Sequence, residues 1–327
     1  MTIILHLGAH RTGTTTFQSL LDRNRADLAR RGLAVWTPAR TRAGLLDGLI
    51  QRPCDATPQD DWRAKRSCGR IRMERARLAG QGQGRLLLSE ENLLGAIRNN
   101  LRERCLFPDA ADRLARLAPA LEGERVVVGL GLRSYRAFWA SSLAFGLAIG
   151  RPVPGPAMLE DLSRQPRRWR HLLDDIARTL PGAEIRVWLA EEMIADPARL
   201  LALLAGRDLA TLRLTGLKDW HNRSPGRDRL RRLLRLRGLD GAAASLAPGD
   251  GPWDPFDAAQ SARMAADYDR DLDWLIARTG AGLRLLPDLD ARAPEPAAPT
   301  TEETPPIAEA AFREEGGHRH GRRHALA

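Results

Sequence analysis

Short apolar runs alternate with longer amphipathic segments along most of the chain. The run 3–7 ends at Gly8, and residues 125–130 form another run bounded by charge and glycine, as buried strands are. A segment of helical character follows the first run as far as Arg31, where Gly32 stops it. Strands that alternate with helices predict an α/β fold with a mostly parallel central sheet.

A hydroxyl-rich turn joins the first predicted strand to the first helix, with the sequence His10-Arg11-Thr12-Gly13-Thr14-Thr15-Thr16. It presents backbone N–H groups and three threonine hydroxyls at a helix N-terminus, where the helix dipole favours an anion. The spacing Gly8-x4-Gly13 copies a phosphate-binding P-loop, but Thr14 stands where nucleotide triphosphatases have lysine. The turn predicts a site for a phosphate-like group without the Lys and Mg²⁺ of ATP chemistry. The alternative is a well-capped helix start.

This loop resembles the 5′-phosphosulfate loop of sulfotransferases that use 3′-phosphoadenosine 5′-phosphosulfate (PAPS), where a Lys-Ser/Thr-Gly-Thr-Thr pattern is usual. Gln18 fits the bacterial branch of that family. The resemblance covers about residues 3–280 and implies a P-loop three-layer αβα sandwich with PAPS as the sulfuryl donor.

Arg133 and Ser141 form a second motif. Arg133 lies just past the predicted strand 125–130, and Ser141 follows eight residues later. In the sulfotransferases that the loop resembles, an Arg and a Ser in this relation clamp the 3′-phosphate of the cofactor. The chemistry is suitable, because a guanidinium offers a phosphate a planar fork of donors and a Ser two helical turns along adds one more. A surface Arg and an ordinary helix Ser are the alternative.

Three further segments are similar to parts of the same family. Residues 85–94 resemble its third strand and end in a Ser-Glu-Asn-Leu pattern, residues 181–188 resemble its next strand, and residues 268–275 resemble a closing helix. Because ligands of such sheets bind at the carboxyl ends of strands, we expect Gly8, Ser89 and Arg133 to converge on one edge.

The resemblance also implies roles for the loop residues. The loop N–H groups with Thr14, Thr15 and Thr16 would hold the 5′-phosphate and the sulfate oxygens, and the cofactor site would also include Arg11, Thr12 and Gly13. Arg11 stands where the family usually has a catalytic lysine. Arginine stays cationic, but its guanidinium group is bulkier than the ammonium group of lysine, and its positive charge is spread over more atoms.

The general base has two candidates. Glu91 best matches the Glu of the Ser-Glu-Asn pattern, and burial near the cofactor could raise its pKa to a useful value. The alternative is that Glu91 or Asn92 caps the following helix. His10, an imidazole within the loop, is the second candidate. No metal is expected.

Composition sets the domain organisation. The chain has 327 residues, of which 43% are hydrophobic, so a large core is expected. We expect one domain over residues 1–290. The resemblance implies that variable insertions, here at about 40–84 and 152–170, build the acceptor pocket. Residues 291–327 are rich in Pro, Ala and Glu and are predicted to be disordered, with His318, His320 and His324 in a solvated end.

The net charge of +10 suits an anionic cofactor. Residues 227–237 predict a basic amphipathic helix, whose leucines either face the core or seat the protein on an anionic membrane or polysaccharide. No nucleic-acid motif is present, so no nucleic-acid partner is expected. Three widely spaced cysteines fit neither a disulfide frame nor a zinc site, and the first strand begins too early for a signal peptide, so we expect a cytoplasmic protein.

These features together predict a sulfotransferase that transfers a sulfuryl group from PAPS to a hydroxyl or amine of a carbohydrate, lipid or small metabolite. One alternative is a catalytically silent relative that binds adenosine 3′,5′-bisphosphate (PAP) or a sulfated glycan. The other is a P-loop nucleotide kinase, which Thr14 disfavours.

Overall fold

A computed structural model describes residues 1–217, 219, 224–280 and 282–286 of the chain. Within these residues a six-stranded sheet has the order β2-β3-β1-β4-β5-β6, and every neighbouring pair is parallel. The strands are β1 (Thr2–Gly8), β2 (Leu33–Trp36), β3 (Arg85–Ser89), β4 (Arg125–Leu132), β5 (Glu184–Leu189) and β6 (Leu283–Leu286). The prediction of an α/β fold with a parallel sheet is confirmed.

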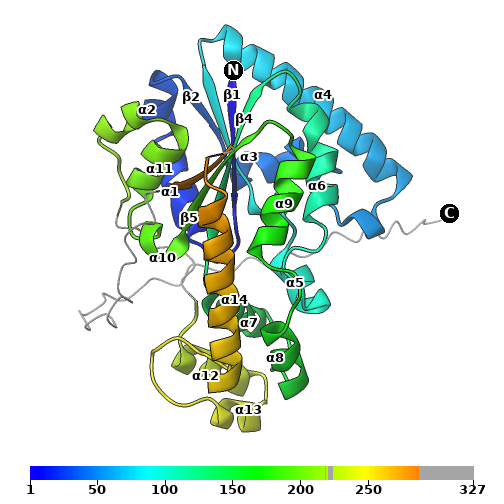
Figure 1. Ribbon diagram of the computed structural model, residues 1–327, viewed down its shortest axis with the longest axis vertical. Coiled ribbons are helices and arrows are strands. Elements are labelled where there is room, and N and C mark those ends of the chain that lie inside the picture. The colour runs from blue at the N-terminus through cyan, green and yellow to red at the C-terminus, as the bar shows by residue number, and fades with distance from the viewer. Residues whose placement is uncertain (218, 220–223, 281, 287–327) are drawn as a thin grey trace, which may run out of the picture. The chain divides into compact units, whose positions relative to one another are not determined.

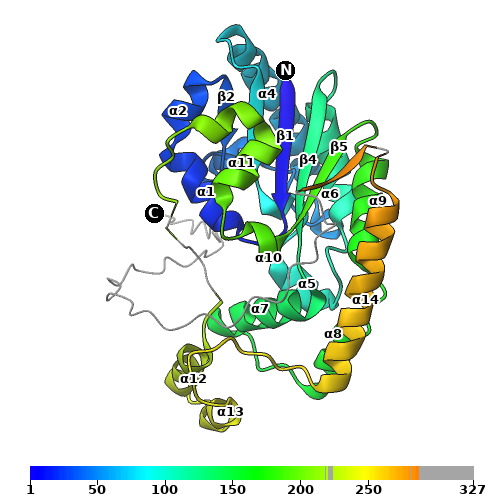
Figure 2. The same ribbon diagram turned by 60° about the vertical axis from the view of Figure 1, so that its left-hand side comes forward.

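Helices cover both faces of this sheet and make a three-layer αβα sandwich (Figures 1 and 2). One face carries α1 (Thr14–Arg23), α2 (Arg25–Arg30), α10 (Ala190–Met193) and α11 (Pro197–Ala205). The core of the other face is built with α4 (Pro58–Gly80), α5 (Ile97–Glu103), α6 (Ala110–Leu117), α7 (Tyr135–Ala148), α9 (Trp169–Thr179) and α14 (Ala258–Ala277).

The connecting segments contain further short helices. They are α3 (Pro38–Arg40), α8 (Pro156–Ser163), α12 (Arg227–Leu236) and α13 (Asp240–Ser245), with the single turns η1 (Thr41–Leu45), η2 (Pro53–Asp55), η3 (Glu91–Leu93), η4 (Ala118–Ala120) and η5 (Arg207–Thr211). Of these, η1 and η3 bring charged side chains to the carboxyl edge of the sheet.

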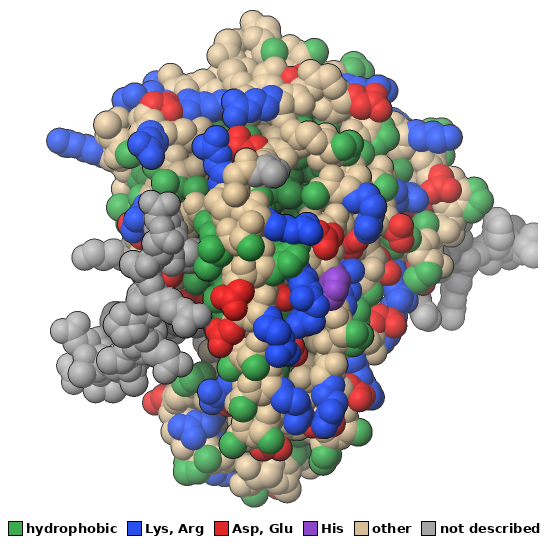
Figure 3. Space-filling model, in the orientation of Figure 1, with side chains coloured by type: hydrophobic (Ala, Val, Ile, Leu, Met, Phe, Trp, Pro, Cys, Tyr) green, Lys and Arg blue, Asp and Glu red, His purple; other side chains and the backbone are tan. Residues whose placement is uncertain are grey.

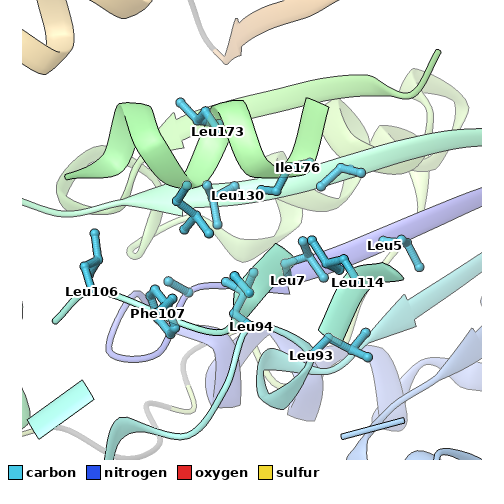
Figure 4. Packing of buried hydrophobic residues seen from close by; sticks show 14 of the residues in the cluster. Leu5, Leu7, Leu93, Leu94, Leu106, Phe107, Leu114, Leu130, Leu173 and Ile176 are labelled. Carbon is cyan, nitrogen blue, oxygen red and sulfur yellow. The ribbon is translucent and has the colours of Figure 1, made fainter. Parts of the chain in front are cut away.

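Successive side chains of a strand point to opposite faces of the sheet, so each strand contributes to the hydrophobic core on both sides. In β1, Leu5 and Leu7 face one layer, whereas Ile4 faces the other. Leu5 and Leu7 lie among side chains of β4, α6 and α9, which Figure 4 shows from close by. Each such leucine contributes about 1.5–3 kcal/mol when it is fully buried, so the sheet is held on both sides.

Strand order brings the predicted site segments together. β1 lies between β3 and β4, with His6 paired to Ser89 and Gly8 paired to Leu130. The carboxyl ends of the three strands therefore meet at one edge. Gly8 and Ser89 end their strands there, and Arg133 follows the last residue of β4.

The helix predicted to run to Arg31 is two helices. Asn24 is buried between them, and its Nδ2 donates hydrogen bonds to the carbonyls of Leu20 (2.7 Å) and Thr215 (3.0 Å). Such side-chain bonds compete with the helical ladder, so the chain restarts at Arg25. Gly32 follows the second helix with a φ of +70°, as the predicted stop requires.

The region 40–84, expected to be an insertion, contains the 23-residue helix α4. Its start is a capping box: Thr57 Oγ1 accepts from the Asp60 N–H (3.2 Å), and the Asp60 carboxylate accepts from the Thr57 N–H (3.0 Å). Ile71 and Cys68 join the core, so most of this region is part of the domain and no loose appendage.

The helices predicted around Ser141, at 227–237 and at 268–275 are confirmed as α7, α12 and α14. All the elements named above belong to a compact unit, Met1–Leu289. The predicted disordered tail, residues 291–327 with its histidines, lies outside the described residues.

Candidate functional site

The turn between β1 and α1 is a tightly folded loop. Arg11 has a φ of +65° and Gly13 a φ of +87°, so two of its residues adopt the left-handed backbone conformation. The hydroxyls of Thr12 and Thr14 both donate to the Ala9 carbonyl, at 2.6 and 2.8 Å. These two threonines therefore hold the loop closed.

Helix α1 starts without a side-chain cap, because its N-cap residue is Gly13. The first turn, Thr14–Thr16, thus presents the positive end of the helix dipole at the carboxyl edge of the sheet, where an anion is favoured. A cavity beneath the loop, next to Thr16 and Trp188, has a volume of only about 10 Å³. That is room for one water at most and too little for a phosphate group.

Arg11 links the loop to two distant segments. Its Nε donates to Ser141 Oγ on α7 (2.8 Å), and its Nη2 donates to Ser224 Oγ (3.0 Å). The two hydroxyls are themselves 2.5 Å apart, and the guanidinium lies 5.6 Å from the Phe145 ring centre. A cation and two hydroxyls therefore converge at one point.

Arg133 lies against the same loop. Its Nη1 donates to the Arg11 carbonyl (2.6 Å), and its own carbonyl accepts from Trp169 Nε1 (2.9 Å). The Arg133 side chain therefore supports the loop, and α9 fixes the Arg133 backbone. We call Arg11, Arg133, Ser141 and Ser224 the arginine–serine cluster.

The two cations of this cluster repel each other. Burial, together with the neighbouring charge of Arg133, lowers the pKa of Arg11 to about 10. Burial also lowers the pKa of Arg133, although the carboxylate of Glu191 works in the opposite direction. Both groups remain charged at neutral pH. Two half-buried like charges beside hydroxyl groups make a site that a polyanion would stabilise.

A second cluster lies beside the loop, where β3 ends. Glu90 is fully buried and accepts from Thr41 Oγ1 (2.5 Å) and from Arg42 Nη2 (2.9 Å). Arg42 Nη2 also donates to Glu91 (2.8 Å), whose other oxygen accepts from Gln18 Nε2 (2.8 Å). Arg42, from η1, thus bridges both carboxylates.

Glu91 is an anion in this setting. Burial works to raise its pKa, but the interactions with His10 and Arg42 and the Gln18 hydrogen bond outweigh burial, so the pKa lies below its ordinary value. Both carboxylate oxygens already accept hydrogen bonds. The expectation of a raised pKa at Glu91 is therefore wrong, because Arg42 bridges to this carboxylate and stabilises the anion. No motif in the sequence marks Arg42. Glu90, with its side chain accepting from the Asn92 N–H, caps the turn η3.

His10 faces this second cluster. Its Nε2 lies 2.9 Å from the Gly95 carbonyl, and its ring stacks on Phe107 with 6.2 Å between the centres. Since a carbonyl only accepts, Nε2 must carry the hydrogen, and Nδ1 is left as the proton acceptor of a neutral ring. Burial lowers the pKa of His10, while the charge of Glu91 works to raise it.

His6 is a core residue. Its Nδ1 lies 2.7 Å from Ser89 Oγ, its ring packs on Trp188 and Phe17, and burial lowers its pKa to about 4. Its proximity to Gln18, which also donates to Ser89 (3.2 Å), joins the core to the second cluster.

The structure divides the predicted site residues into two groups. Arg11, Arg133 and Ser141 meet in the arginine–serine cluster, whereas Glu91 belongs to the second cluster, which His10 faces. Thr12, Gly13 and Thr14–Thr16 form the loop and helix start between them.

Sequence reasoning missed Ser224 and Arg42. Ser224 precedes a Pro-Gly pair, which indicates a turn but no ligand, and Arg42 lies where no motif is recognisable. A depression of about 350 Å³ lined by Pro166, Arg167 and residues of α9 contains none of the loop or cluster residues, so it is separate from this site.

Comparisons with models of protein families, with curated proteins and with solved structures found no match for this chain. In the part of the chain that the structure describes, no helix is both long and apolar enough to cross a membrane. Nor does any group of three or more His, Cys, Asp or Glu side chains there have the arrangement to hold a metal ion.

Proposed function

We propose that the protein is a sulfotransferase that uses PAPS. The observation that carries the proposal is the convergence of Arg11 and Arg133 with Ser141 beside an uncapped helix start. This donor set fits a nucleotide with two separate phosphate positions, since the cluster and the helix N-terminus are two anion sites joined by one loop. Arg11, Arg133, Ser141 and Ser224 would hold the 3′-phosphate, and the Thr14–Thr16 turn the 5′-phosphosulfate.

PAPS would supply the sulfuryl group, and the acceptor would be a hydroxyl or amine of a carbohydrate, lipid or small metabolite. For this chain we assign proton removal to His10. Its ring is neutral, its tautomer is set by Gly95, and Glu91 stabilises the cation that forms when Nδ1 takes the proton. Glu91 is a positioning residue, held by Arg42 and Gln18.

One observation favours a second candidate, a silent relative that binds PAP without transfer. The Arg11 guanidinium is occupied by Ser141 and Ser224, away from the second cluster. It would then be a binding group only, unlike the lysine whose place it takes.

The first test is calorimetric titration with PAP, using adenosine 5′-phosphate and ATP with Mg²⁺ as controls. We expect binding that requires the 3′-phosphate. Ser141→Ala should weaken it, whereas Ser142→Ala should not, because Ser142 is buried in the same helix but donates to the Phe138 carbonyl. A preference for ATP with Mg²⁺ would instead indicate a kinase and overturn the proposal.

Turnover separates the two remaining candidates. Release of PAP from PAPS in the presence of acceptors is expected for a sulfotransferase. Tight PAP binding without release, and gain of release in Arg11→Lys, would identify the silent relative.

A further inference from the structure

Helix α12 has one face inside the protein and one face outside. Leu230 and Leu234 are buried against Ala144 and Leu147 of α7 and against α13. The leucine stripe predicted for 227–237 thus faces the core. Packing against the core does not account for the residues on the opposite, outer face of α12.

The outer face combines arginine with an exposed leucine. At 100° per residue, Leu236 falls between Arg229 and Arg232 on the helix, with Arg235 next to them. All three arginines are exposed, and Leu236 is 78% exposed, the highest value among the large hydrophobic side chains that the structure describes. A leucine in that setting is costly in water and suited to an apolar medium.

Among the described residues, these three arginines lack the contacts that hold their neighbours in the helix. No described residue forms an ion pair or hydrogen bond with Arg229, Arg232 or Arg235, whereas Arg231 pairs with Asp228 and Arg237 donates to the carbonyl of Ala148. Stretch 227–239 contains six arginines and one acid, which Arg231 already engages. The outer face is therefore strongly cationic.

Two more exposed apolar side chains lie near the end of α12. Arg237 joins the end of α12 to the end of α7, where Ile149 is 44% exposed. Leu239, two residues beyond Arg237, is 43% exposed. Figure 2 shows α12 and α13 beyond α7, away from the sheet, and Figure 3 shows basic and hydrophobic side chains together at this end. We call Arg229, Arg232, Arg235, Leu236, Leu239 and Ile149 the basic corner.

We propose that the basic corner docks on a membrane that contains anionic lipid. Arginine heads would meet the lipid phosphates while Leu236, Leu239 and Ile149 enter the boundary between headgroups and acyl chains, the pattern of interfacial helices. A polysaccharide would use the charges alone and leave the leucines exposed. Ser224, which contacts Arg11, lies five residues before Arg229, so docking holds the arginine–serine cluster near the lipid surface. The proposal does not depend on sulfuryl transfer.

The test is flotation of the full-length protein with vesicles of phosphatidylcholine, with and without phosphatidylglycerol. Binding is expected only with the anionic lipid. Replacement of Arg229, Arg232 and Arg235 by Gln should weaken it about 100-fold, because each basic residue near such a surface contributes about 1 kcal/mol. Leu236→Ser should weaken it about tenfold through lost apolar burial.

A matched control replaces Lys65, Arg70 and Arg72 of α4 by Gln, which removes the same charge from another exposed helix. Its binding should stay within about twofold of the parent, in line with screening of distant charges. If the control variant lost vesicle binding to the same extent, the effect would depend on net charge alone, and the proposal would be overturned. Equal binding to neutral vesicles, or capture by heparin that matches vesicle binding and ignores Leu236→Ser, would also overturn it.

Discussion

Arg133 has two tasks that a single substitution can expose. It supports the loop through the Arg11 carbonyl, and in the proposed function it would also donate to the 3′-phosphate. Arg133→Ala should weaken PAP binding by about 1.5–3 kcal/mol, the range for a charged hydrogen bond. Calorimetry measures this, with Arg136→Ala as the control, since Arg136 is an exposed neighbour paired with Asp254. Unchanged affinity in Arg133→Ala would remove Arg133 from the site.

The identity of the base can be read from the pH dependence of turnover. A base acts when unprotonated, so activity falls as the pH drops through its pKa. For His10 that pKa lies below the ordinary 6.5, and for Glu91 it lies below the ordinary 4.5. If His10 is the base, we expect an acid limb that lies below pH 6.5 and is lost in His10→Gln. We also expect Glu91→Gln to lower turnover while PAP affinity stays nearly intact. A limb that persists in His10→Gln would assign the proton to another group.

His6 should make the folded state sensitive to acid. Its folded pKa is about 4 and its unfolded value is near 6.5, so only the unfolded chain binds this proton between those pH values. Stability therefore falls as the pH drops through that window, by about 1.4 kcal/mol per pH unit for one such group. Urea unfolding of the wild type and His6→Gln at several pH values measures it. Parallel profiles of the two proteins would show that His6 is not the source.

At the scale of elements, the loop depends on Gly13. A Cβ there would lie 2.7 Å from Ile194 Cγ1, and the φ of +87° is unfavourable for any other residue. Gly13→Ala should destabilise the protein by about 1–3 kcal/mol and abolish PAP binding. Gly69→Ala, where α4 leaves open space, should instead stabilise it by about 0.5–1 kcal/mol. Denaturant unfolding of both variants measures the contrast. Equal effects would mean that the loop geometry is not limiting.

The sequence predicted those elements whose signal is local. β1 and β4 are apolar runs, and α12 shows the helical period of apolar residues, so these strands and this helix are predicted from the local pattern. β2 was missed because four apolar residues after Gly32 carry no distinctive pattern, and the break at Asn24 was missed because its partner Thr215 lies 191 residues away.

The candidate site shows the same division. Gly8 and Arg11 could be singled out because a glycine pattern marks the loop, and Arg133 and Ser141 because their spacing resembles that of a known family. That Arg11 would bind Ser141 could not be predicted, since the contact depends on how α7 lies across the edge of β4. The bridge from Arg42 to two carboxylates depends likewise on the packing of η1 beside β3.

At the scale of the molecule, the net charge of +10 attracts anionic ligands over a distance, before they contact the site. Raising NaCl from about 50 mM to about 500 mM should weaken PAP binding by about three- to tenfold, because the screening length falls from about 14 Å to about 4 Å. Calorimetry at both salt concentrations measures it. Adenosine, which is uncharged, is the control and should show no such change. Salt-independent PAP affinity would contradict a phosphate-directed site.

The bond from Arg11 to Ser224 spans 213 residues, and this has a consequence for how the protein is made. At a synthesis rate of about 5–20 residues per second, Ser224 leaves the ribosome roughly 10 to 40 s after Arg11. During that interval the Arg11 guanidinium lacks one of its two hydroxyl partners. The nascent chain therefore completes the arginine–serine cluster late, when about two thirds of the polypeptide has been translated.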